Sequence, residues 1–169
     1  MEDMDVTQLI DSLKDTDEFL TMQALSMLVE MGDDALDELI NGLSNSDKNI
    51  RKNCAKALGE ISNPKSIDAL IKALSDSNKW VRRESSSALS KMGSEAVEPL
   101  TQCLDDADWR VKGAAAWALG NLKDNRAVTP LCKLLDQDNN GFVKQGALSS
   151  LKLIDTPESN KALLKYQNE

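Results

Sequence analysis

The stretch DADWRVKGAAAWALGNL, residues 106–122, has a pattern that indicates the architecture of the whole chain. Related stretches recur along the chain: DEFLTMQALSMLVEM (17–31), SDKNIRKNCAKALGEI (46–61), SNKWVRRESSSALSKM (77–92) and NNGFVKQGALSSLKLI (139–154). One leucine marks the same position in every copy, with separations of 30, 31, 30 and 32 residues between Leu28, Leu58, Leu89, Leu119 and Leu151. Self-similarity at such a period predicts a repeat protein in which neighbouring units share a continuous core.

Each copy predicts a pair of helices. An Asp or Asn, the preferred helix N-caps, stands three residues before the first aliphatic anchor of every copy: Asp17, Asp47, Asn78, Asp108 and Asn140. A second apolar stretch follows after a turn, and Gly32 and Gly93 suit the left-handed conformation that ends a helix. The predicted fold class is therefore all-α, a right-handed α-solenoid of about eleven helices. We expect a single domain, 1–169, built from a half-repeat 1–16 and repeats 17–46, 47–77, 78–107, 108–138 and 139–169.

The segment 106–138 also resembles a known family. Its sequence is similar to the HEAT-like repeat of phycobilisome lyase subunits, through Asp108, Val111-Lys112, the alanines at 114–116, Ala118-Leu119-Gly120 and Ala127-Val128 before Pro130-Leu131. Residues 77–106 match nearly as well, and the resemblance covers about residues 5–169. It implies that the second helices line a concave face and the first helices a convex face. It implies little about function, because one repeat frame carries many different surfaces.

Composition narrows the classes of function. The net charge of −8 makes nucleic acid an unsuitable general partner, and no apolar run is long enough to cross a bilayer. The sequence has no histidine, the commonest general base and metal ligand, and its three cysteines lack metal-ligand spacing. We therefore expect a cytoplasmic protein that is not an enzyme, with no catalytic residues, no metal, no cofactor and no membrane partner.

The expected concave face is the first candidate binding surface. Its polar positions change from acidic to basic and apolar along the chain: Asp37, Glu38, Asn41, Asp68, Lys72, Glu98, Gln102, Lys133, Leu134, Lys165 and Tyr166. Residues 1–46 carry a net charge of −11, and the remainder carries +3. A groove with such polarity predicts a protein or peptide partner that contributes a basic segment. The alternative is that exposed helix faces vary freely and show a trend by chance.

The second candidate surface is on the expected convex face. Trp117 aligns with Ser26, Lys56, Ser87 and Ser149, so its side chain is expected in solvent beside Gly113. An exposed tryptophan there predicts a binding hot spot, unless the ring merely stacks on Arg110. Trp80 and Trp109, beside the anchor valines, are instead expected to pack between repeats.

The sequence therefore favours a non-catalytic protein-interaction scaffold that uses the concave face or the Trp117 surface. One alternative, implied by the resemblance, is an enzyme subunit or chaperone of the phycobilin-lyase type. Another is a nucleic-acid-binding HEAT-like protein, which the acidic N-terminal segment disfavours. Leu163, Leu164 and Tyr166 close the last helix with few charges, so pairing with a second copy through the C-terminal end stays open.

Overall fold

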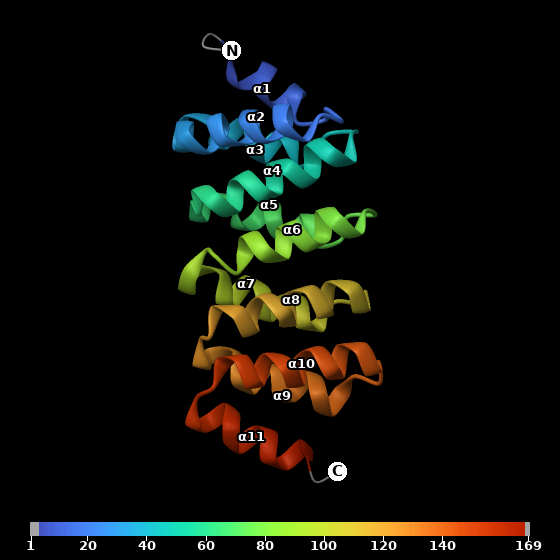
Figure 1. Ribbon diagram of the computed structural model, residues 1–169. Helices are drawn as coiled ribbons and strands as arrows, with labels where there is room; N and C mark the ends of the chain where they lie inside the picture. The colour runs from blue at the N-terminus through green and yellow to red at the C-terminus, as the bar shows by residue number, and fades with distance from the viewer. Residues whose placement is uncertain (1–3, 168–169) are drawn as a thin grey trace. The chain divides into compact units, whose positions relative to one another are not determined.

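A computed structural model describes residues 4–167, and for Gln167 the backbone alone. Within this range the protein is all helical, with no strand. The chain divides into two compact units, Met1–Met92 and Gly93–Glu169. In Figure 1 the helices of each unit lie in successive layers, coloured from blue to green in the first unit and from yellow to red in the second. The predicted all-α class is confirmed, whereas the single-domain organisation stays a prediction.

The helices of the first unit are α1(Val6–Ser12), α2(Glu18–Met31), α3(Leu36–Gly42), α4(Lys48–Ile61), α5(Ile67–Ala73) and α6(Lys79–Leu89). Those of the second unit are α7(Val97–Gln102), α8(Trp109–Leu122), α9(Val128–Gln137), α10(Gly141–Ile154) and α11(Pro157–Gln167). Single 3₁₀ turns precede or follow the short second helices: η1(Gly32–Ala35), η2(Pro64–Ser66), η3(Gly93–Ala96), η4(Cys103–Asp105) and η5(Asn125–Ala127). Long first helices therefore alternate with short second helices.

Both ends of the first helices follow local chemistry. All five predicted N-caps are confirmed, because each Asp or Asn side chain accepts hydrogen bonds from first-turn amides of α2, α4, α6, α8 or α10. Gly32 and Gly93 have positive φ, as expected. Ser62, Lys123 and Asp155 also have positive φ, in the left-handed helical conformation after α4, α8 and α10, which the sequence pattern did not predict.

Close approach of first helices depends on glycine at one repeated position. A Cβ added to Gly59 of α4 would lie 2.8 Å from the Cα of Ala88 in α6. A Cβ on Gly120 of α8 would lie 2.7 Å from the Cα of Ser150 in α10. The Ser150 hydroxyl donates to the Ala116 carbonyl at 2.7 Å, which adds a buried hydrogen bond at this crossing. In each unit, a glycine at this position thus allows two first helices to pack closely.

Polar side chains tie the first and last helices to their neighbours. In the first unit, the Asn53 amide of α4 donates to the Leu13 carbonyl at the end of α1, at 2.9 Å. In the second unit, the Tyr166 hydroxyl of α11 donates to the Cys132 carbonyl of α9, at 3.1 Å. Carbonyls at helix ends lack intrahelical partners, so the bond from Asn53 satisfies an acceptor that would otherwise be unpaired.

A search of the described helices found none with the length and apolar character that crossing a membrane requires.

Candidate functional site

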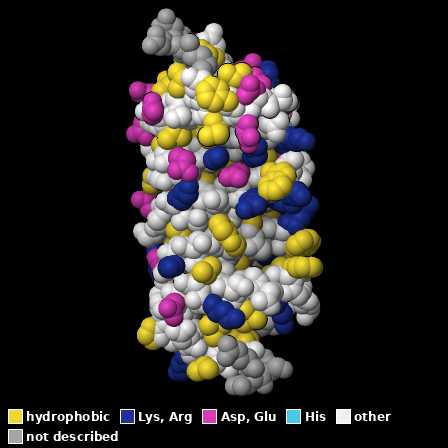
Figure 2. All heavy atoms as spheres, in the orientation of Figure 1, with side chains coloured by type: hydrophobic (Ala, Val, Ile, Leu, Met, Phe, Trp, Pro, Cys, Tyr) yellow, Lys and Arg dark blue, Asp and Glu magenta, His cyan; other side chains and the backbone are white. Residues whose placement is uncertain are grey.

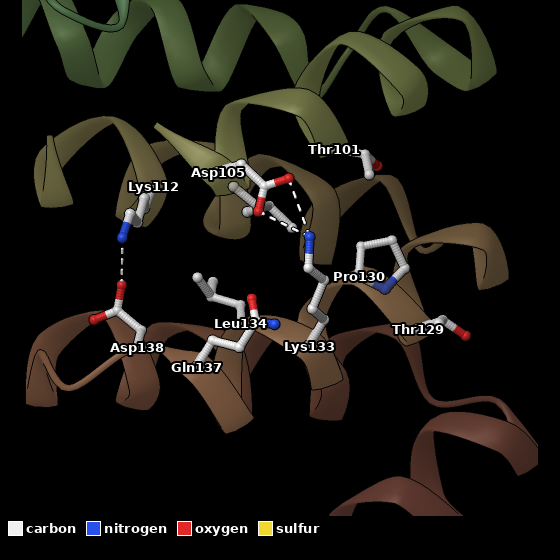
Figure 3. Close-up of a pocket in the computed structure, with 10 residues that line it drawn as sticks. Thr101, Asp105, Lys112, Thr129, Pro130, Lys133, Leu134, Gln137 and Asp138 are labelled. Atoms are coloured by element: carbon white, nitrogen blue, oxygen red, sulfur yellow. Dashed lines mark hydrogen bonds and ion pairs between the residues drawn. The ribbon is translucent and has the colours of Figure 1, made fainter. Parts of the chain in front are cut away.

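A hollow in the second unit lies between the short helices α7 and α9. Its volume is about 280 Å³. Figure 3 shows its residues, which come from α7, the 3₁₀ turn η4, the start of α8, and α9 with the residue after it: Thr101, Leu104, Asp105, Lys112, Thr129, Pro130, Lys133, Leu134, Gln137 and Asp138. Leucine and proline side chains supply an apolar floor, and charged groups stand on two sides. The hollow is therefore amphipathic.

One side of this hollow carries an exposed ion pair. The Lys133 amine lies 3.1 and 3.2 Å from the two carboxylate oxygens of Asp105, and both side chains are exposed. In Figure 3 the Lys133 chain extends from α9 toward Asp105 across the mouth of the hollow. Exposed pairs contribute about 0–1 kcal/mol to stability. A charged group of a partner can therefore replace either member at little cost.

The opposite side carries a more buried pair. The Lys112 amine of α8 lies 2.6 Å from a carboxylate oxygen of Asp138, whose side chain is buried. The hydrogen bond from Lys112, helped by the Asn140 amide, lowers the pKa of Asp138 below its ordinary value. In the first unit Arg51 of α4 makes the corresponding pair with Asp76, through two bonds of 2.7 and 3.1 Å. These pairs hold the turns between repeats in place, so they are structural.

The first unit has an equivalent hollow between α3 and α5. Its volume is about 540 Å³, and its residues are Ile40, Asn41, Leu43, Ser44, Lys65, Asp68, Ala69, Lys72, Ala73, Ser75 and Asp76. Ser44 and Ala73 align with Asp105 and Leu134 of the second unit. Lys72 therefore lacks a counterpart of Asp105, and no ion pair of Lys72 is found within residues 4–167, although Asp68 and Asp76 also line the hollow.

The structure brings some of the predicted concave residues together. Asn41, Asp68 and Lys72 line the hollow of the first unit, and Lys133 and Leu134 line that of the second. Four further predicted residues are exposed on the second helices but line neither hollow: Asp37, Glu38, Glu98 and Gln102. Whether any of these residues binds a partner stays a prediction.

Three expectations about apolar groups need correction. Leu134 was expected as an exposed apolar group, but it is only 5% exposed and forms the floor of its hollow. Tyr166 is turned back onto α9, where its hydroxyl also donates to Asp136 at 2.9 Å beside the Lys165–Asp136 ion pair. Burial, with the hydrogen bond to Asp136, raises the pKa of Tyr166 to about 12. Leu163 is buried as well, so the C-terminal apolar surface proposed for pairing is reduced to Leu164.

The predicted convex residues lie on α8. Trp117 is 46% exposed, and a Cβ on Gly113 would meet nothing within 4 Å, so the surface between them is open. The Arg110 guanidinium bonds to the Asp108 carboxylate at 2.7 to 3.0 Å, and it forms no cation–π contact with Trp117. The alternative in which Arg110 covers the indole ring is therefore wrong.

The other two tryptophans are more exposed than expected. Trp80 is 47% exposed and Trp109 is 49% exposed, so neither is packed away between repeats. Trp109 does contact the next repeat, since its ring centroid lies 6.1 Å from that of Phe142. Trp80 lies instead against cations of its own helix, with Lys79 at 5.0 Å and Arg83 at 5.6 Å from the ring centroid. The sequence spacing therefore did not predict that all three indoles are about equally exposed.

Side chains for covalent or metal chemistry are scarce in the part of the chain that the structure describes. No group of three or more potential metal ligands is found there. Burial raises the pKa of the Cys54 thiol to about 12, and it also raises the pKa values of Cys103 and Cys132. A thiol is nucleophilic as the thiolate, so these environments do not activate it.

The chain belongs to the HEAT-repeat family. The family model for HEAT repeats matches residues 36–106 and 67–152, which together cover more than half of the sequence. A curated relative is the phycocyanobilin lyase subunit alpha of Synechococcus elongatus, which is 39% identical over 114 residues. The match covers 68% of this chain and 29% of that subunit. The resemblance seen in residues 77–138 is confirmed.

Solved structures support the same fold. The complex of CpcE and CpcF of phycocyanin lyase from Nostoc sp. contains a chain with a TM-score of 0.66 and 22% identity, covering 86% of this chain and 96% of that one. A designed armadillo repeat protein in complex with the peptide (KR)4 has a TM-score of 0.51 and 23% identity, covering 97% and 88%. Human deoxyhypusine hydroxylase has a TM-score of 0.51 and 21% identity, covering 97% and 67%. The predicted class, an α-solenoid of HEAT-like hairpins, is confirmed.

Proposed function

We propose that this protein is a non-catalytic scaffold that binds a protein segment through the second-helix hollow of the second unit. The observation that carries the proposal is the lining of that hollow, where buried Leu104 and Leu134 lie beside the exposed Lys133–Asp105 pair. Half-buried Pro130, which lines the hollow with these leucines, offers an apolar surface against which a partner side chain can pack, and the exchangeable ion pair orients the partner's charges. The hollow opens at the surface, so a peptide or a helix can enter without a change of fold.

The relatives support a protein partner. The similar chain from Nostoc sp. is part of a complex of two proteins, CpcE and CpcF, and the similar designed repeat protein binds a peptide of lysine and arginine. The acidic second helices of the first unit, with Asp37, Glu38 and Asp68, favour a basic segment in the partner. A non-enzymatic role, a cytoplasmic location and the absence of a nucleic-acid partner are parts of the same proposal.

Site-specific photocrosslinking tests this proposal. A photoreactive amino acid at Gln137, which lines the hollow, is compared with the same group at exposed Gln145 on α10. Crosslinking in extracts of the source cells, followed by mass spectrometry, is expected to capture one protein from position 137 and not from position 145. The capture is expected to disappear when Lys133→Glu is added.

Two variants make the result decisive. Trp117→Ala reports on the convex alternative, since loss of capture in that variant alone moves the binding surface to α8. Lys152→Glu makes the same charge change as Lys133→Glu at an exposed site on α10 and is expected to leave capture intact. Equal capture from both crosslinking positions, or capture that survives Lys133→Glu, would contradict the proposal.

A second candidate rests on one observation, the 39% identity to a phycocyanobilin lyase subunit. In that case the chain is a subunit or chaperone of a bilin lyase, even though it spans 29% of the relative's length. Titration of the purified chain with phycocyanobilin tests this possibility directly. A saturable shift of the bilin absorption band would favour the lyase class. An unchanged spectrum would remove this second candidate and keep the protein-binding proposal.

A further inference from the structure

A basic surface lies on the first helices of the first unit, away from both hollows. It consists of Lys48, Lys52 and Lys56 of α4 with Lys79, Trp80 and Arg83 of α6, and we call it the Trp80 patch. Three of these lysines and Trp80 line a shared depression of about 470 Å³. Figure 2 shows dark blue side chains gathered around a hydrophobic one at the right of the α4–α6 layer.

The charges of the Trp80 patch are not balanced by the chain itself. None of its five cations forms an ion pair with any residue from 4 to 167, although Glu84 also lines the depression. Some basic side chains of the first helices do form ion pairs, as in Arg51–Asp76 and Lys112–Asp138, although Arg82, Lys144 and Lys152 form none within residues 4–167. Five unpaired cations on one surface of an acidic protein repel one another, so a bound anion would stabilise them.

The position of two lysines strengthens this argument. Lys48 and Lys79 are the first residues of α4 and α6, where the helix dipole and free amides favour negative charge. Both therefore stand where a cation is least favourable within its helix. The Trp80 ring, which lines the depression, has Lys79 and Arg83 over it at 5.0 and 5.6 Å from the centroid, so two further cations lie beside this residue.

We propose that the Trp80 patch binds an acidic segment of a partner protein in an extended conformation. Lys48, Lys52 and Lys56 follow one another at intervals of four residues on α4, a rise of about 6 Å each. Side chains on one face of an extended peptide repeat every two residues, about 6.8 Å apart. Carboxylates at alternate positions of an extended segment therefore match the lysine row, and the exposed Trp80 offers area for an apolar neighbour.

A protein segment fits this surface better than a polyanion. The first unit contains the whole acidic segment 1–46, whose net charge of −11 repels a long nucleic acid or an anionic membrane. Four of the five cations are lysines, which lack the planar fork with which arginine grips phosphate in two places. The Trp80 patch is separate from the hollow of the second unit. This inference therefore does not depend on the function proposed above.

Fluorescence anisotropy with the full chain tests the inference. The probe is a short fluorescein-labelled peptide with glutamate at every second position and one phenylalanine. The comparison peptide has the same composition with its glutamates contiguous. We expect the alternating peptide to bind saturably, more tightly than the contiguous one, and more weakly as salt is added because the contacts are charged.

Matched variants locate the site. Lys48→Glu with Lys56→Glu is expected to raise the dissociation constant about ten-fold, whereas Lys152→Glu with Lys161→Glu makes the same charge change on the second unit and should raise it less than about two-fold. Trp80→Ala is expected to weaken binding, and Trp117→Ala, which removes an equally exposed indole, is not. Circular dichroism of each variant checks that the helices remain folded.

Three results would overturn the inference. The first is equal weakening by the two double-lysine variants, which would mean that only net charge matters. The second is tighter binding of a single-stranded oligonucleotide or of phosphatidylserine vesicles than of the peptide, since either assigns the patch to a different class of partner. The third is equal affinity for the alternating and contiguous peptides, which would contradict the match between the lysine spacing and an extended peptide.

Discussion

The two second-helix hollows share one backbone design but differ in chemistry. In the first unit Lys72 faces Ser44 across a hollow of about 540 Å³. In the second unit Lys133 faces Asp105 across a hollow of about 280 Å³, and Pro130 and Leu134 stand where the first unit has Ala69 and Ala73. Larger side chains at equivalent positions fill space, which accounts for the smaller volume. The hollow of the first unit is therefore wider, and the hollow of the second unit is narrower and more apolar.

This difference shows how a repeat protein separates folding from recognition. The positions that differ line the hollows, whereas the capping residues and the helix-crossing glycines are alike in both units. Substitutions in the shared set are therefore expected to change stability, and substitutions in the variable set to change binding.

The largest expected effect tests whether the glycine crossings are equivalent. Gly120→Ala and Gly59→Ala should each destabilise the protein by about 2 kcal/mol, because the added Cβ would lie 2.7 or 2.8 Å from a backbone atom of the neighbouring helix. Gly113→Ala is the control, since its Cβ meets open space and alanine favours the helix by about 0.5–1 kcal/mol. Urea unfolding measures all three. Similar free energies for Gly120→Ala and Gly113→Ala would disprove the close approach.

The next effect concerns the pairs that hold the inter-repeat turns. Lys112→Met should cost about 1–2 kcal/mol, because it leaves the buried Asp138 carboxylate without its cation. The pKa of Asp138 is lowered in the folded state, so the pair stabilises at neutral pH, and that stability is lost as the pH falls below about 4. The stability gap between wild type and variant should narrow in acid. Exposed Lys152→Met serves as the control, and a gap that persists at low pH would contradict the assignment.

A smaller effect on stability is expected from loosening the last helix, α11. Tyr166→Phe should cost about 1 kcal/mol through loss of the hydrogen bonds to Cys132 and Asp136. Tyr166 is the one tyrosine of the sequence, so its absorbance at alkaline pH reports it directly. Ionisation is expected near pH 12, against about 10 in urea. A folded pKa above the unfolded value gives stability that is complete below pH 10 and lost as the pH rises through 12. Ionisation near pH 10 in the folded protein would show that α11 is not docked this way.

The smallest expected effect is an exchange between the hollows. Ser44→Asp gives Lys72 the partner that Lys133 has, and Asp105→Ser removes it from Lys133. Each change should alter stability by less than about 0.5 kcal/mol, because the pairs are exposed. Thermal melts at low and high salt measure it. The same Asp105→Ser variant is expected to change partner capture from position 137, and a large loss of stability instead would make this pair structural.

The sequence predicted the repeat frame because that frame depends on local chemistry. Capping by Asp17, Asp47 and their equivalents involves residues two or three positions apart, so it is visible in a short stretch. The three positive-φ residues other than glycine were not predicted, since Ser62 and Lys123 have no left-handed preference and the tendency of an aspartate such as Asp155 is weak beside that of glycine. The candidate site was predicted only in part. Lys133 follows from helical periodicity, but Asp105 joins it from 28 residues away.

Local patterns were therefore enough to predict the HEAT-repeat class, the helix starts, and the division into buried leucines and exposed polar positions. Packing between repeats was needed to show that Leu134 forms a floor, that Tyr166 turns back onto α9, and that Asp105 meets Lys133. The difference lies in how far apart in the sequence the interacting residues are. Caps and periodicity act within one or two helical turns, whereas the environment of a surface side chain depends on neighbours about thirty residues away that only packing brings close.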